Sequence, residues 1–190
     1  MRHARNAAIA ALFALLAAGG LFAQSWKLAA PIAAKPALLT SVGQSADIEM
    51  VKVLLDRAKL DYKADGQVKA PALAATGAKT LIIAIGGSSK GLGAAGISAD
   101  AELERSKLLI AEAKRLGMKI LGIHVGGEAR RGELSDKFIL AAVASCDYVV
   151  VVAEGNADGL FTKLCAQAKI PLDTVEKISK AGEPLLRAFK

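Results

Sequence analysis

Short apolar runs alternate with amphipathic stretches along most of this chain. Four runs are hydrophobic on both of their faces, which is typical of buried strands, and they span residues 38–42, 80–85, 119–125 and 148–152. Between the runs, hydrophobic residues recur at spacings of three and four, as at Ile48, Val51 and Leu55, which predicts helices. This alternation favours a three-layer α/β domain with a mostly parallel sheet.

The number of strands depends on one short segment around Tyr62. If that segment is a strand, the sheet has five strands, and the flavodoxin-like order 2-1-3-4-5 is the expected one. If it is not, four strands remain in a Rossmann-like sheet. After a helix marked by Leu160, Leu164 and Ala168, the pattern predicts two short helices, broken where Gly182 precedes Glu183-Pro184.

The N-terminus has the order of a secretory signal peptide. Arg2, His3 and Arg5 precede an apolar run and small residues, and Ala23 suits the cleavage position. We therefore predict a signal peptide at 1–23, an extended leader at 24–36, a single domain at 37–190, and export to the periplasm or the exterior. The alternative is a retained anchor, because the apolar stretch from Ala7 to Phe22 nearly reaches the roughly 17 residues that span a membrane. After cleavage, no stable membrane insertion is expected.

Charge and cysteine content narrow the classes of partner. The formal net charge is +7, and the basic residues are scattered without a run of five, so the chain lacks the pattern of a nucleic-acid-binding protein. Mild basicity suits a small anionic partner instead. Cys146 and Cys165 have no metal-ligand spacing with a histidine, so no metal is expected. They pair only if their Cα atoms lie within about 7 Å; otherwise they are two buried thiols.

Polar or glycine-rich segments follow each of the four apolar runs. In parallel sheets, ligands bind beyond the carboxyl ends of the strands, where all four segments would meet. Glycine allows close approach to a ligand, and lysine or arginine supplies charge for an oxyanion. The predicted ligand-binding residues are Ser41, Gln44, Ser45, Ser88, Ser89, Lys90, His124, Glu128, Arg130 and Arg131. The alternative is that the segments are only tight turns, which we favour for 154–159 but not for the five-glycine segment 86–96.

Several known motifs partly match the segment 86–96. Gly91, Gly93 and Gly96 match G-x-G-x-x-G without the expected acid after the next strand, and Leu92 stands where a Walker motif needs lysine. Residues 87–91 fit the nucleophile-elbow pattern around Ser89, although the glycines that follow are a poor helix start. A small hydrolase or transferase would then use Ser89 as nucleophile, His124 as base and Glu128 to orient it. A histidine satisfied by neighbouring backbone is the more common arrangement.

A flavin site is also disfavoured, although the spacing Ser41-x-Gly43-x-Ser45 resembles the phosphate loop of flavodoxins. The later segments lack the aromatic residues that stack on an isoalloxazine ring. We therefore expect no cofactor.

Four strings of residues resemble a family of exported bacterial proteins known only as a domain of unknown function. They are residues 40–47 (TSVGQSAD), 86–96 (GGSSKGLGAAG), 126–132 (GGEARRG) and 154–156 (EGN), within a resemblance that runs from about Leu38 to Phe189. The resemblance implies no activity, substrate or catalytic residue.

Three functions remain open from the sequence. The leading hypothesis is an exported protein that binds a small carboxylate or phosphate compound through Ser88, Ser89, Lys90, Arg130 and Arg131. The second is the serine-dependent hydrolase or transferase. The third is a scaffold or partner-binding subunit whose glycine segments are only turns.

Overall fold

The domain is built on a six-stranded, wholly parallel sheet with the order β2-β1-β3-β4-β5-β6. A computed structural model describes residues 26–189. The strands are β1 (Ala37–Val42), β2 (Tyr62–Ala64), β3 (Thr80–Ile85), β4 (Lys119–His124), β5 (Tyr148–Val152) and β6 (Leu172–Val175). The predicted fold class and the order 2-1-3-4-5 are confirmed. The predicted number of strands is corrected to six, because β6 adds an edge strand beside β5.

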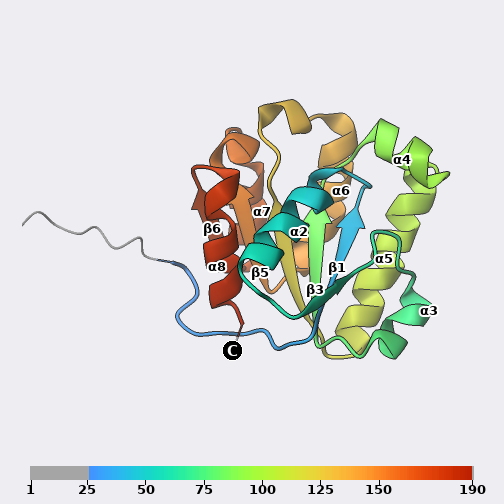
Figure 1. Cartoon of the computed structure of the whole chain (residues 1–190). Coiled ribbons are helices and arrows are strands. Elements are labelled where there is room, and N and C mark those ends of the chain that lie inside the picture. Colours follow the sequence, from blue (N-terminus) through green and yellow to red (C-terminus); the bar gives the residue numbers. More distant parts are fainter. Residues whose placement is uncertain (1–25, 190) are drawn as a thin grey trace, which may run out of the picture.

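Helices cover both faces of the sheet (Figure 1). One face packs against α2 (Asp47–Arg57) and α8 (Gly182–Arg187), and the other against α5 (Ala99–Arg115), α6 (Glu133–Ala142) and α7 (Leu160–Ala168). Two shorter helices are α3 (Ala70–Leu73) and α4 (Ser89–Ala95). Every residue of β1, β3 and β5 is buried, which explains why these strands are apolar on both faces.

Two local predictions have different outcomes. The two short C-terminal helices are present, as the 3-10 helix η5 (Ile178–Lys180) and α8. The expectation that the glycines after Ser89 oppose a helix is wrong, since α4 begins at Ser89 and continues through Gly91 and Gly93. Ser88 caps this helix by accepting a hydrogen bond from the Gly91 amide at 3.1 Å.

The described part of the leader is held against the end of the chain. The amides of Ile32 and Ala33 donate to the Ala188 carbonyl at 2.9 and 2.7 Å, and Ala33 is buried. The predicted signal peptide lies outside the described residues. Between residues 26 and 189, no helix is long and apolar enough to cross a membrane.

Cys146 and Cys165 are both buried in the cluster beneath α5, α6 and α7, and both are free thiols in this structure. Burial raises the pKa of Cys165 to about 11 and also raises the pKa of Cys146. Both groups are therefore protonated at neutral pH, and each serves as a small apolar side chain.

Candidate functional site

The segments that follow β1 and β3 are hydrogen-bonded to each other. The Ser45 amide donates to the Gly86 carbonyl at 3.2 Å, and the Ser88 amide donates to the Gly43 carbonyl at 3.0 Å. Gln44 and Gly87 form an antiparallel bridge between the same segments. The strand order reverses between β1 and β3, and ligands often enter such a reversal point. In this protein, the main-chain hydrogen bonds between the two segments occupy that reversal point.

Glycines at this edge make room for neighbouring main chain. A Cβ on Gly91 would lie 1.8 Å from the Gln44 carbonyl oxygen, far inside van der Waals contact. A Cβ on Gly43, whose φ is +101°, would lie 2.5 Å from the Gly86 carbonyl oxygen. Packing between the segments therefore accounts for these two glycines.

A buried ion pair on α5 fixes the segment after β1. Glu102 is completely buried and accepts from Arg105 Nε at 2.7 Å and from the Gly43 amide at 2.9 Å. Arg105 also donates to the Val68 carbonyl at 2.7 Å and to the Ser41 carbonyl at 2.5 Å. Sequence reasoning missed this pair, although a glutamate followed by an arginine three residues later was visible on the predicted helix.

Three of the predicted ligand-binding residues lie in β1 or just after it: Ser41 belongs to the strand, and Gln44 and Ser45 follow it. Gln44 Nε2 donates to the Gly66 carbonyl at 3.0 Å and to Glu102 Oε1 at 3.1 Å. Ser45 Oγ accepts from the Asp47 amide at 3.2 Å, and both Ser41 and Ser45 are buried. Gln44 and Ser45 thus support the segment, whereas the Ser41 hydroxyl is buried without a hydrogen-bond partner among the described residues. None of the three side chains lines the hollow described below.

His124 is buried at the end of β4. Its Nδ1 lies 2.7 Å from the Ile85 carbonyl oxygen, and since a carbonyl only accepts, Nδ1 carries the proton. Its Nε2 is buried with no hydrogen-bond partner among the described residues, and the ring packs on Phe161 at 5.1 Å between centroids. Burial lowers the pKa of His124, although the bond to Ile85 opposes this effect.

The constellation that a serine hydrolase would need is not assembled. Ser89 and Glu128 are exposed, whereas His124 is 1% exposed. No hydrogen bond joins His124 to either residue in the described part of the chain, because its single bond goes to Ile85. The base and the nucleophile therefore lack the contact that proton transfer requires.

The pH dependence of stability should report on His124. A histidine with a lowered pKa in the folded state binds fewer protons there than in the unfolded chain. The free energy of unfolding should therefore fall as the pH decreases below about 6.5, the ordinary histidine pKa, by at most about 1.4 kcal/mol per pH unit. Urea unfolding between pH 5 and pH 8 measures this slope.

The matched variant is His124→Asn, whose amide can still donate to the Ile85 carbonyl. His124 is the only histidine after residue 23, so this variant should flatten the slope in that pH range. An unchanged slope would show that other groups titrate on unfolding.

Arg131 clamps the segments after β4 and β5 together. Its guanidinium donates to Asp136 at 2.8 Å, to the Gly155 carbonyl at 2.6 Å and to Asp158 at 2.9 Å, and it lies over Phe161. The hydrogen bonds to Asp158 are the largest cause that raises the pKa of Arg131. The side chain is only 10% exposed, so most of its binding capacity is already used within the protein.

Arg130, in contrast, is 52% exposed and lies beside a small hollow. This hollow, which we call the α6 hollow, measures about 280 Å³ and is lined by Gly87, Ser89 and residues 129–135. It lies against the first turn of α6, which begins without a side-chain cap. Asp47 Oδ1 lies 3.7 Å from the Arg130 Nε.

The remaining predicted residues differ in their positions. Ser89 lines the α6 hollow, Ser88 caps α4, and Lys90 is exposed on the first turn of α4 without lining the hollow. Glu128 belongs to a second hollow of about 250 Å³, which also contains Arg131 and Asp158. The structure thus brings Ser89 and Arg130 together. Among residues 26–189, no group of three or more histidine, cysteine or acidic side chains could hold a metal ion.

Comparison with known protein families gives one match. The family model described as a domain of unknown function, DUF6305, matches residues 34–189. None of the curated proteins matches the chain.

Solved structures give distant likenesses. A dTDP-4-dehydrorhamnose reductase from Clostridium acetobutylicum is 8% identical over 74% of each chain, with a TM-score of 0.41. An esterase, EstA, from Pseudoalteromonas is 11% identical over 74% of this chain and 78% of its own, with a TM-score of 0.33. A GDSL-like lipase from Bacteroides thetaiotaomicron is 11% identical over 77% and 72%, with a TM-score of 0.35. Likenesses at this level assign no function.

Proposed function

The chain belongs to the DUF6305 family of domains of unknown function, and we propose that this member binds a small anion, a carboxylate or phosphate compound, in the α6 hollow. The observation that carries the proposal is that a half-exposed arginine, Arg130, and an uncapped helix start face the same hollow. We also propose, from residues 1–23, that the protein is exported.

Three kinds of donor support the proposal. The guanidinium of Arg130 offers charged N–H groups that suit a planar or tetrahedral oxyanion. The first-turn amides of α6 add the partial positive charge of a helix start, although Glu133 of the same turn also lines the hollow and opposes this effect. Ser89 contributes a hydroxyl at the same hollow, whose 280 Å³ suits a small compound.

The three predicted basic residues differ in how far each is available to bind an anion in the α6 hollow. Arg131 borders the hollow, but Asp136, Asp158 and Gly155 already occupy its donors. Lys90 does not line the hollow, so it can act only through a longer-range field. Arg130 is therefore the principal cation in this proposal.

Arg130→Ala should lower the affinity for inorganic phosphate about tenfold or more, since a charge-assisted hydrogen bond contributes about 1.5–3 kcal/mol. Lys90→Ala should have a smaller effect. Calorimetry measures both affinities, and thermal melts should remain unchanged because both side chains are exposed. Lys63→Ala, in the distant edge strand β2, is the control.

Equal affinities in wild type, Arg130→Ala and Lys90→Ala would place the anion elsewhere. Native mass spectrometry of the protein purified from its host would then identify any compound that it retains.

A second candidate, a non-catalytic scaffold, is favoured by one observation. The segments after β1 and β3 bond to each other and fill the reversal point of the sheet. In this alternative the glycines only permit packing, and no tested anion binds to the protein.

A further inference from the structure

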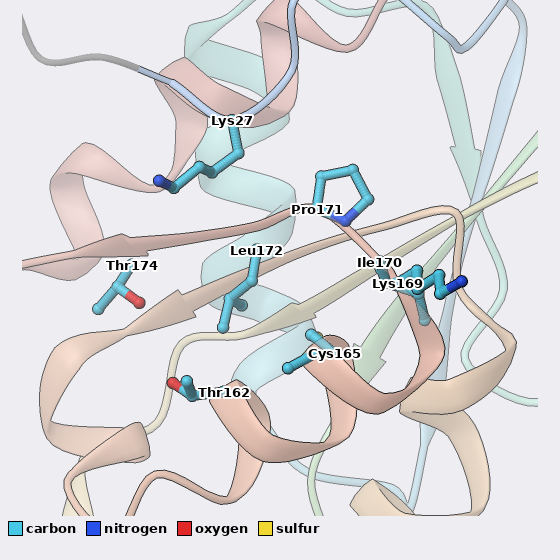
Figure 2. Close-up of a pocket in the computed structure, with 9 residues that line it drawn as sticks. Lys27, Thr162, Cys165, Lys169, Ile170, Pro171, Leu172 and Thr174 are labelled. Carbon is cyan, nitrogen blue, oxygen red and sulfur yellow. The ribbon is translucent and has the colours of Figure 1, made fainter.

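A second candidate binding surface lies along the outer edge of β6, with which no other strand pairs among the described residues. It shares no lining residue with the α6 hollow. A groove of about 590 Å³ runs between this edge and α7, and we call it the β6 groove (Figure 2). Its apolar floor includes Cys165, Ile170 and Leu172. Lys27 of the leader and Lys169 at the end of α7 also line it.

The backbone of β6 points alternately toward β5 and away from it. The Val149 amide donates to the Pro171 carbonyl at 3.0 Å, and Val149 pairs in register with Leu172. In a parallel ladder with this register, the main-chain groups of Asp173 and Val175 also face β5. The N–H and C=O groups of Leu172 and Thr174 therefore face outward, and these two residues are the ones in β6 that line the groove.

The surroundings of this edge favour a particular kind of occupant. Leu172 and Thr174 project from β6 toward α7, where Thr162 and Cys165 are small enough to leave space (Figure 2). Outward main-chain groups in a groove suit an extended polypeptide, which pairs by adding a strand. Two lysines line the groove, and none of the described residues that line it is acidic, so the complementary polypeptide is acidic.

We propose that β6 binds an extended acidic segment of a partner protein, which adds a seventh strand to the sheet. The main-chain groups of Leu172 and Thr174 pair with the segment. Lys27 and Lys169 attract its carboxylates, and the apolar floor receives every second side chain. This interaction involves none of the residues of the α6 hollow, so it holds or fails independently of anion binding.

The sharpest test removes one hydrogen-bond donor from the edge. Thr174→Pro deletes an amide that faces outward, so it should leave the sheet intact while blocking strand addition. The probe is a blocked, fluorescently labelled decapeptide of alternating aspartate and threonine, and anisotropy measures its binding. We expect at least a tenfold loss of affinity in Thr174→Pro. The control Thr174→Val keeps the amide, removes the hydroxyl and should bind like the wild type.

The second arm tests charge. Lys27→Gln should weaken binding of the acidic peptide severalfold, and a peptide of alternating lysine and threonine should not bind. Hydrogen exchange in the wild-type complex should show slower exchange at the Leu172 and Thr174 amides. A thermal melt of Thr174→Pro verifies that this variant folds. If the variant does not fold, the hydrogen-exchange data and the Lys27→Gln variant test the proposal instead.

Three results would overturn the proposal. They are equal binding of the acidic peptide by folded Thr174→Pro, equal binding of the two peptides, and unprotected amides at Leu172 and Thr174. A dimer that is abolished by Thr174→Pro, in a protein that does not bind the peptide, would instead assign the edge to a second copy of this chain.

Discussion

Replacing Arg105 by methionine is expected to lower the free energy of unfolding by about 3–5 kcal/mol, because it leaves a buried carboxylate without its counter-charge. Glu102 is fully buried, and the Arg105 side chain is only 10% exposed. The substitution also removes the donors to the Ser41 and Val68 carbonyls. Urea unfolding at neutral pH measures the loss.

A matched pair elsewhere on α5 provides the control. Arg115 pairs with Glu112 at the same spacing and a similar distance of 2.7 Å, but its side chain is 67% exposed. Arg115→Met should therefore leave the free energy of unfolding nearly unchanged, because water screens an exposed ion pair. Adding Glu102→Gln to Arg105→Met should restore part of the lost stability, because the buried charge is then absent. A small loss in Arg105→Met would mean that water or a rearrangement compensates Glu102.

The Glu102–Arg105 pair also fixes the segment that follows β1, at the carboxyl edge of the sheet. Glu102 holds the Gly43 amide and the Gln44 side chain, and this segment bonds in turn to the segment that carries Ser89. Stability and the geometry of the proposed anion site are therefore coupled through main-chain contacts. Loss of Arg105 should loosen this coupling even where the rest of the domain stays folded.

The central strands were predictable because burial on both faces leaves a continuous apolar run. β3 and β5 occupy the residues that the pattern indicated. β6 was missed because an edge strand is partly exposed to solvent and therefore lacks a continuous apolar run. Its sequence, Leu-Asp-Thr-Val, is only four residues long and alternates apolar with polar side chains. Asp173 is nevertheless buried, where it accepts from the Tyr148 hydroxyl at 2.5 Å and from the Lys27 amide. A contact between such distant segments has no local signal.

The candidate site was predictable only in its location. The carboxyl edge of a parallel sheet gathers the polar segments whatever their details, and Ser89 and Arg130 do meet there. The roles of the two adjacent arginines were not predictable, because they depend on partners in other segments. Arg131 is occupied by Asp158, which follows a different strand, whereas Arg130 remains half exposed.

Gly91→Ala is expected to destabilise the domain by about 1–3 kcal/mol, the usual cost of inserting an atom into a packed region. Helix propensity predicts the opposite sign, since alanine favours a helix interior by about 1 kcal/mol over glycine. Packing should prevail because the new Cβ would lie 1.8 Å from the Gln44 carbonyl oxygen, a backbone atom that cannot move without separating the segments after β1 and β3.

Gly93 provides the control within the same helix. A Cβ there would meet no heavy atom within 4 Å beyond its neighbours in the same helix, so Gly93→Ala should stabilise the domain by about 0.5–1 kcal/mol. Thermal and urea unfolding of the two variants should therefore show shifts of opposite sign. Gly91→Ala should also weaken phosphate binding, because displacement of α4 moves Ser89 away from Arg130. If Gly91→Ala were as stable as Gly93→Ala, the packing of α4 against Gln44 would be looser than the structure shows, and the five glycines of residues 86–96 would again need a ligand to explain them.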